Sequence, residues 1–162
     1  MKVKDLMTTN VKSCREYSTL NSTAQMMWDH DIGCVPIVDH DNRVIGMLTD
    51  RDVSMSAYLQ GGPLTAASVT SAMSKELFSC HPDDDLASAE RLMRDKQIHR
   101  APVVDADGRL TGIVSLNDIV REAAQESERK RPREVSDVEV ISTIASVCAP
   151  RHRIIEATQA AA

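Results

Sequence analysis

Two short segments of the chain carry the same pattern of side chains able to bind or react. Residues 46–52 read GMLTDRD and residues 112–118 read GIVSLND. Each has a hydroxyl residue, Thr49 or Ser115, followed three positions later by a carboxylate, Asp52 or Asp118. An apolar run typical of a strand precedes each hydroxyl, and the hydroxyl is expected to open a helix.

This spacing has two interpretations. A hydroxyl with an acidic residue three positions later is close to a capping box, in which both side chains bond free N–H groups of the first helical turn. The residues alone favour this structural interpretation. A helix start also favours phosphate, because its N–H groups are unpaired and carry partial positive charge. A carboxylate there could accept hydrogen bonds from two vicinal ribose hydroxyls, as acidic residues do in dinucleotide sites.

Three basic side chains could add to a phosphate site. Arg51 lies inside the first segment, and His99 and Arg100 come just before a strand that contains Pro102. Arginine would supply a charge-assisted contact to a phosphate oxygen. Taken alone, His99 and Arg100 are better explained as an exposed pair entering a strand.

The two segments belong to an internal duplication. Sliding the sequence over itself by 66 residues aligns residues 3–53 with 69–119 without a gap, and 16 of the 51 pairs are identical. Each copy predicts a β-prone segment (11–14 or 77–80), a helix capped near residue 19 or 85, two strands and a second helix. The strands are expected at 34–38 and 44–48, and again at 101–104 and 110–114. The order is β-α-β-β-α, twice.

The duplication also predicts the domain organisation. Repeat 1 covers residues 1–59, a linker broken by Gly61-Gly62-Pro63 covers 60–68, and repeat 2 covers 69–124. Residues 125–162 are expected to form a charged linker, a helix and a frayed tail. Apolar residues at 135, 138, 141, 144, 145 and 148 predict that this helix is amphipathic.

Composition narrows the function classes. The net charge is −5, and the one basic run, at 129–133, is flanked by glutamates, so neither nucleic acid nor an anionic membrane is an expected partner. The four cysteines lack zinc-site spacing, and neither a signal peptide nor a membrane span is expected, which fits free thiols in a reducing cytoplasm. The sequence has no nucleophile elbow and no P-loop, so an enzyme and a bound metal are not expected.

At this point the chain resembles a pair of cystathionine-β-synthase-type (CBS) domains, the tandem unit called a Bateman module. The motifs that carry the resemblance are DLMT, IGCVPIVD and GMLTDRDV in the first copy and SAMS, IHRAPVVDADG and GIVSLNDIV in the second. It covers about residues 3–120. The resemblance implies an α/β (α+β) fold, in which the two repeats pack through their sheets into one module, with the C-terminal amphipathic helix outside the shared unit.

The resemblance also implies a stand-alone regulatory module with two equivalent clefts that bind an adenosine compound. AMP, ADP or ATP is expected, with S-adenosylmethionine or a dinucleotide as alternatives. Ribose would be held by Asp52 and Asp118, and adenine would lie between aliphatic side chains, since only 2% of residues are aromatic. One cleft would combine Ile113, Ser115, Asn117 and Asp118 with Val11, Ile32 and Gly33. The other would combine Met47, Thr49, Arg51 and Asp52 with Leu77, Ile98, His99 and Arg100.

Two further expectations concern partners. Modules of this kind generally pair, so a homodimer is expected, and any output must pass through a separate protein partner. The alternative to a nucleotide sensor is a structural adaptor whose clefts bind nothing.

Overall fold

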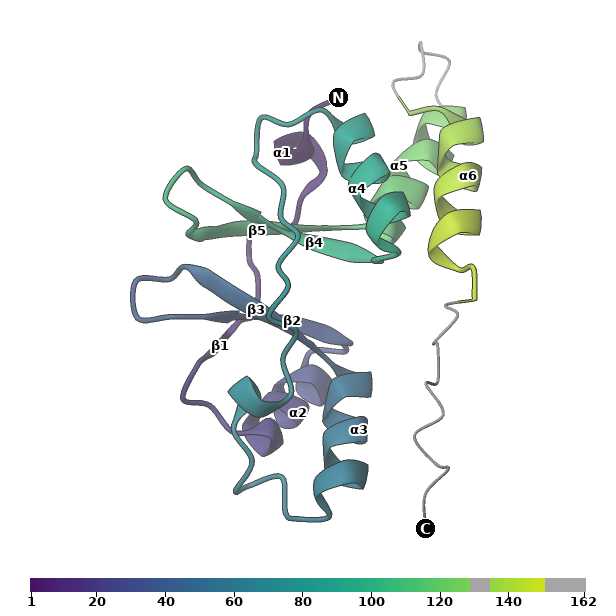
Figure 1. The fold of residues 1–162 in the computed structure, drawn as a ribbon. Helices are drawn as coiled ribbons and strands as arrows, with labels where there is room; N and C mark the ends of the chain where they lie inside the picture. The colour runs from purple at the N-terminus through teal and green to yellow at the C-terminus, as the bar shows by residue number, and fades with distance from the viewer. Residues whose placement is uncertain (129–134, 151–162) are drawn as a thin grey trace, which may run out of the picture.

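The computed structural model describes residues 1–128 and 135–150 and shows two stacked α/β layers (Figure 1). Most of the expected charged linker and the tail lie outside the described residues. The elements of the first half are α1 (Val3–Leu6), β1 (Cys14–Arg15), α2 (Leu20–Asp29), β2 (Cys34–Val38), β3 (Val44–Thr49) and α3 (Asp50–Gln60). Those of the second half are η1 (Val69–Ser71), α4 (Leu86–Lys96), β4 (Arg100–Val104), β5 (Leu110–Ser115), α5 (Leu116–Glu128) and α6 (Asp137–Val147).

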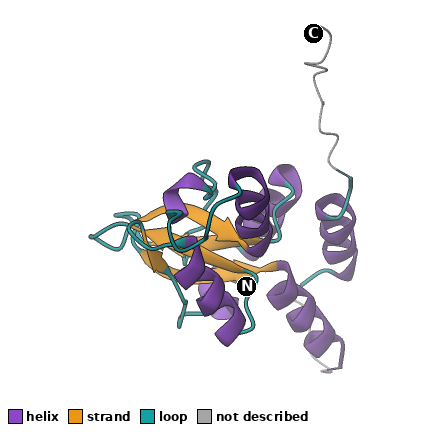
Figure 2. Ribbon diagram, turned by 90° about the horizontal axis from the view of Figure 1, so that it is seen from below, coloured by secondary structure: helices purple, strands orange, loops and turns teal. Residues whose placement is uncertain are grey.

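The two sheets repeat the same antiparallel hairpin. In repeat 1, β2 pairs with β3 so that Pro36 lies opposite Met47, and β1 adds a parallel edge strand. In repeat 2, β4 pairs with β5 so that Pro102 lies opposite Ile113, which is the same register displaced by 66 residues. The helices lie on the outer faces of the sheets, and the sheets face each other (Figures 1 and 2). The mixed α/β fold of two packed repeats is therefore confirmed.

The expected first strands are shorter than the sequence suggested. The strand predicted at 11–14 is wrong, because the structure places a two-residue strand at Cys14–Arg15. The strand predicted at 77–80 is reduced to a single parallel bridge between Cys80 and Val103. The reason lies upstream, where the backbone of Thr8 pairs with Ile113 of the other repeat. The residues after Thr8 must then cross from one sheet to the other before any local pairing begins.

The repeats exchange their leading segments. α1 opens repeat 1 in the sequence, yet Val3 is fully buried in the core of repeat 2. In the same way, Val69 opens repeat 2 and is fully buried in the core of repeat 1. Thr8 pairs with Ile113 and Ser74 pairs with Met47, each through two backbone hydrogen bonds of 2.8–3.3 Å. Neither repeat can therefore complete its core alone.

Glycine allows this exchange at two equivalent positions. A Cβ atom on Gly46 would lie 2.7 Å from the backbone oxygen of Ser74 and 2.8 Å from the sulfur of Met73. A Cβ atom on Gly112 would lie 2.6 Å from the sulfur of Met7. Both contacts are too short for any side chain. Glycine at these positions lets the leading segment of one repeat lie directly on the strand of the other.

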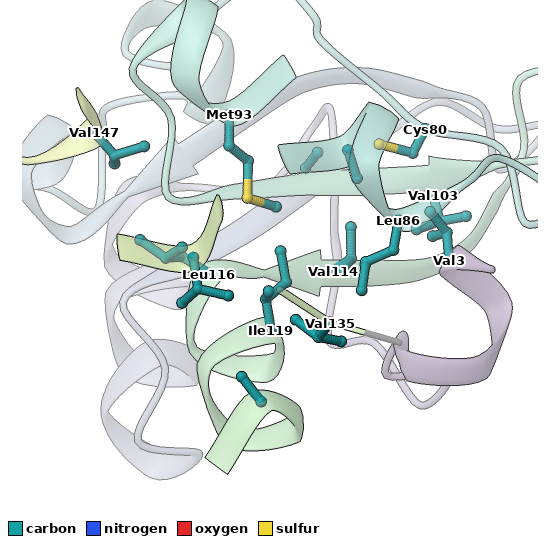
Figure 3. Close-up of a cluster of buried hydrophobic side chains, with 14 residues drawn as sticks. Val3, Cys80, Leu86, Met93, Val103, Val114, Leu116, Ile119, Val135 and Val147 are labelled. Carbon is teal, nitrogen blue, oxygen red and sulfur yellow. The ribbon is translucent and has the colours of Figure 1, made fainter. Parts of the chain in front are cut away.

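α6 packs on the outer helices of repeat 2. Val140, Thr143 and Val147 are buried against α4 and α5, and Val135 and Val147 lie in the same cluster as Met93 and Ile119 (Figure 3). The C-terminal helix is therefore confirmed, but its expected apolar face is right only in part, since Val135 and Ile144 pack in this cluster and the other positions do not. Val138 and Ile141 remain 76% and 66% exposed, because the buried positions 140, 143 and 147 form a different stripe at the same helical spacing. Among the described residues, no helix is long and apolar enough to cross a membrane.

Candidate functional site

The Thr49–Asp52 pair stands where β3 ends and α3 begins. The Asp52 Oδ2 atom accepts hydrogen bonds from the Thr49 backbone N–H at 2.9 Å and from the Thr49 hydroxyl at 2.7 Å. In return, the backbone N–H of Asp52 donates to Thr49 Oγ1 at 3.2 Å. This is a complete capping box, and it fixes the rotamers of both side chains at the open end of the helix.

The Ser115–Asp118 pair has the same geometry in repeat 2. Asp118 Oδ2 accepts from the Ser115 N–H at 2.9 Å and from the Ser115 hydroxyl at 2.6 Å, and the Asp118 N–H donates to Ser115 Oγ at 3.3 Å. One contact differs between the repeats. Arg121, one turn further along α5, donates from Nη2 to Asp118 Oδ1.

The capping box occupies only one oxygen of each carboxylate. Both hydrogen bonds to Asp52 and both from Ser115 to Asp118 end on Oδ2. Within the described part of the chain, no donor binds Oδ1 of Asp52, whereas Arg121 binds Oδ1 of Asp118. The capping and binding interpretations are therefore compatible, since the cap orients a carboxylate whose second oxygen can serve a ligand.

Arg100 crosses from repeat 2 to the start of α3 in repeat 1. A Cβ atom on Gly33 would lie 3.7 Å from Arg100 Nη1 and 3.2 Å from Asp50 Oδ2. Burial raises the pKa of the Cys34 thiol, the charge of Arg100 and a hydrogen bond from it oppose the rise, and the nearby Asp52 and Asp50 carboxylates add to it. A cation from one repeat and two carboxylates from the other therefore act on the pKa of the same buried thiol.

Sequence reasoning missed Cys34 and Asp50 in this group. A signal for Cys34 was available, because the displacement of 66 residues pairs Cys34 with Arg100. Residues paired in this way can meet where two equivalent repeats face each other. Arg43 and Arg109 form another such pair, and their backbones make an isolated bridge between the sheets.

The remaining expected site residues fall into three groups. Val11 lies three residues after Thr8, which pairs with Ile113 of repeat 2, and Leu77 lies three residues after Ser74, which pairs with Met47 of repeat 1. Both therefore lie on segments that contact the opposite repeat. Ile32–Gly33 and Ile98–His99 precede β2 and β4, and the carbonyls of Gly33 and His99 accept the N–H of Asp50 and Leu116 in their own repeat. Arg51 and Asn117 are exposed in the first turns of α3 and α5.

A hollow of about 360 Å³ lies on the outer helical side of repeat 1. It includes Ile32 and Gly33 of the expected site but neither Thr49 nor Asp52. Its other lining residues are Ala24, Met27, Trp28, Asp31, Asp50, Val53 and Ser54. The hollow therefore borders the junction that Arg100 enters, because Gly33 and Asp50 belong to both.

One group among the described residues has the side chains and spacing to hold a metal ion, at the exposed turn between β2 and β3. It consists of Asp39, His40 and Asp41. Asp39 Oδ1 already accepts the N–H groups of Asp41 and Arg43 at 2.9 and 2.8 Å, and Asp41 Oδ2 lies 3.3 Å from Arg43 Nη1. These carboxylates serve to stabilise the turn, which explains their presence without a metal.

The chain folds as two α/β repeats that exchange their leading segments and carry equivalent capped carboxylates. This arrangement defines a class of paired α/β modules. A family model described as the CBS domain matches residues 3–56 and 67–125, and the chain belongs to this family. The CBS domain-containing protein YhcV of Bacillus subtilis is 39% identical over 126 residues, which cover 77% of this chain and 88% of YhcV.

Two solved structures extend the comparison. A crystal structure of Hypoxic Response Protein I with two coordinated zinc ions has a TM-score of 0.69 and 32% identity, covering 75% of this chain and 98% of that one. The crystal structure of CBSX2 in complex with AMP has a TM-score of 0.68 and 25% identity, covering 79% of this chain and 98% of that one.

Proposed function

We propose that this protein is a regulatory module that senses an adenosine nucleotide at the junction of its two CBS repeats. The observation that carries the proposal is the pair of equivalent carboxylates, each held by a capping box through a single oxygen. The AMP complex of CBSX2 supports the ligand class. The module would signal to a separate protein and perform no catalysis itself.

In the repeat 1 cleft, the open Oδ1 of Asp52 would accept hydrogen bonds from the two ribose hydroxyls. The N–H groups of Asp50, Arg51 and Asp52 are already bonded within the protein, so the start of α3 would offer a phosphate mainly the partial positive charge of the helix end. Arg100 reaches this helix start from the other repeat, so its guanidinium is available for a charge-assisted bond. A ligand bound in this way would bridge both repeats, which gives binding a route to change how they pack.

The repeat 2 cleft would bind the same ligand class more weakly. Arg121 must release Asp118 Oδ1 before ribose can use it. The Arg121 side chain is 71% exposed, so this ion pair is worth at most about 1 kcal/mol. Occupation of this cleft is therefore disfavoured by roughly fivefold and not prevented.

The test is thermal unfolding with a panel of adenosine, AMP, ADP, ATP and S-adenosylmethionine. Saturation at a hundred times Kd stabilises by about 2.7 kcal/mol, which is a rise in Tm of roughly 5–10 °C for a chain of this size. Asp52→Ala should lose the part of this shift that belongs to the repeat 1 cleft. Arg100→Ala should weaken nucleotides more than adenosine, because only the phosphate contact is removed.

Thr19→Ala is the matched control, because Thr19 caps α2 through Ser22 N–H at 3.2 Å and lies outside the cleft group. Both variants should lose about 1 kcal/mol of stability through the missing cap, but only Asp52→Ala should lose the ligand response. If no compound in the panel shifts the wild-type Tm at millimolar concentration, the clefts are vestigial and the adaptor alternative holds.

We also propose that the protein is a cytoplasmic homodimer. The four cysteines are free, three of them buried, which supports a reducing compartment. Large apolar side chains remain exposed on the helices, which supports self-association. Light scattering at micromolar concentration should give twice the mass of the 17.8 kDa chain, and a monomer would contradict the dimer.

A further inference from the structure

The duplication gives the chain two equivalent helical grooves, and among the described residues only the groove of repeat 2 is filled. In repeat 2, α6 lies on α4 and α5. Arg94 Nη1 donates to Thr143 Oγ1 at 2.9 Å and Gln97 Nε2 donates to the Ser146 carbonyl at 3.2 Å. The groove residues of repeat 2 are Met93, Arg94, Gln97, Ile98 and Ile119. The equivalent residues of repeat 1, 66 positions earlier, are Met27, Trp28, Asp31, Ile32 and Val53. All five of these repeat 1 residues line the open hollow of about 360 Å³ between α2 and α3.

The helices beside the open groove carry more exposed apolar side chains than their counterparts in repeat 2. Trp28 lines the groove and is 85% exposed, and Met55, Tyr58 and Leu59 are exposed elsewhere on α3; these four residues are here called the repeat 1 face. Repeat 2 carries Arg94, Arg121, Ala124 and Gln125 at the four equivalent positions. Large exposed aromatic and aliphatic side chains around a hollow are typical of a surface that another molecule covers.

α6 carries a second apolar stripe that faces away from its own groove. Val138, Ile141, Ala145 and Cys148 follow one another at helical spacing and are all exposed, and together they form what is here called the outer stripe. The buried stripe of the same helix contains Val140, Ile144 and Val147. A helix that is apolar on both sides can fill one groove while presenting itself to another.

We propose that the outer stripe of α6 docks in the open groove of repeat 1 of a second copy of this chain. The filled groove shows that this groove shape accepts a helix of this kind, and the open groove is lined by the apolar side chains that a second docking helix needs, Met27, Trp28, Ile32 and Val53. α3 and α6 both lie to the right of the sheets in Figure 1, so helices that carry the two surfaces lie on the same side of the module. A two-fold axis then makes the same contact twice and covers both surfaces on both copies.

The inference rests on the proposed homodimer and specifies its interface. The test measures the dimer dissociation constant by sedimentation for Trp28→Arg, which installs the residue found at the equivalent position of repeat 2, and for Ile141→Arg. Each should weaken the dimer by about thirtyfold or more, as interface anchors do. Tyr17→Arg is the control, because Tyr17 is 80% exposed and belongs to neither surface, and it should leave the constant unchanged.

Mixing the two variants tests which surfaces meet. A mixed dimer keeps one native contact, between the groove of the Ile141→Arg chain and the outer stripe of the Trp28→Arg chain, so mixing should restore part of the association. If only Trp28→Arg weakens the dimer, two repeat 1 faces meet each other and the proposal is wrong. A dimer insensitive to both variants uses another surface, and a monomeric wild type leaves the groove to another occupant; both results overturn it.

The nucleotide response separates this inference from the proposed function. Ile141 and Tyr17 lie outside the expected ligand-binding residues, whereas Trp28 shares its hollow with Ile32 and Gly33. Tm shifts with AMP should therefore survive in Ile141→Arg and Tyr17→Arg, and Ile141→Arg is the variant that separates the two proposals. Unchanged circular dichroism will show that each variant is folded. Loss of the dimer with an intact nucleotide shift supports the docking proposal, whereas a dimer that depends on Ile141 but does not respond to any nucleotide contradicts only the sensor.

Discussion

Glu90 offers a test of how α6 is held on repeat 2. Its side chain belongs to α4 and is only 3% exposed, and its Oε1 atom has no hydrogen-bond partner. Burial raises the pKa of Glu90, the charge of Glu139 on α6 raises it further, and Arg94 on α4 opposes the rise. The carboxylate is therefore destabilising in its ionised form, and replacing it with neutral glutamine should stabilise the protein.

The expected gain is modest. A buried polar atom without a partner costs about 1–3 kcal/mol, and more when it is charged. Glutamine keeps a polar group at the site and Arg94 already compensates part of the charge, so we expect Glu90→Gln to add about 1 kcal/mol at neutral pH. For a chain of this length, that is a rise in Tm of about 2–4 °C.

The gain must depend on pH with a definite sign. Glu90 has a higher pKa when folded than its ordinary value of 4.5, so between pH 4.5 and the raised pKa the folded protein holds a proton that the unfolded chain has released. Wild type therefore loses stability relative to Glu90→Gln as pH rises from 4.5 through the raised value. Below pH 4.5, Glu90 is neutral in both the folded and the unfolded chain, so the free energies of unfolding of wild type and Glu90→Gln should converge.

The assay is urea unfolding of both proteins at about pH 4 and about pH 7.5, compared as a difference so that other carboxylates cancel. Glu139→Gln is the second variant. It should reduce the pH dependence only in part, because burial is the larger cause of the raised pKa. If Glu90→Gln is less stable than wild type at neutral pH, or if the difference does not vary with pH, the reasoning about this interface is refuted.

Two further predictions concern the exchanged segments and the second cleft. Gly46→Ala should cost about 1–3 kcal/mol in thermal unfolding, because its Cβ would lie 2.7 Å from the Ser74 carbonyl oxygen, whereas Gly62→Ala, with open space around it, should cost far less. Arg121→Ala should raise AMP affinity in the repeat 2 cleft a few-fold by calorimetry, because it frees Asp118 Oδ1. Weaker AMP binding would instead show that Arg121 contacts the ligand.

The local structure that the sequence predicted depends on short-range signals. The strand at Cys34–Val38 was predicted with its observed ends, and the other hairpin strands within one residue of theirs, because apolar runs bounded by turn residues define them. The helix starts followed from their caps. The exchange of leading segments could not be predicted in this way, because Val3 fits the core of either repeat equally well by residue type.

The buried face of α6 was predicted only in part for a related reason. Residues 138, 141, 145 and 148 form an apolar stripe as regular as the one that the structure buries, so periodicity alone cannot choose between them. The buried side of the helix also meets α4 through hydrogen bonds that no pattern of apolar residues reports, from Arg94 to the Thr143 hydroxyl and from Gln97 to the Ser146 backbone carbonyl. A helix with two apolar stripes is itself informative, because a chain gains stability from the second stripe only when another surface covers it.

The capped carboxylates show the limit of motif reasoning most clearly. The sequence offered a cap and a ribose site as alternatives for Asp52 and Asp118. In the structure the cap uses only Oδ2 of each carboxylate, so Oδ1 is the atom that could bind a ligand. A duplicated cap would look the same in sequence whether or not a ligand binds. What differs between the clefts is the neighbour of that second oxygen, which is Arg121 in repeat 2 and no described donor in repeat 1. Occupancy of the two clefts should therefore be unequal, even though their motifs are equivalent.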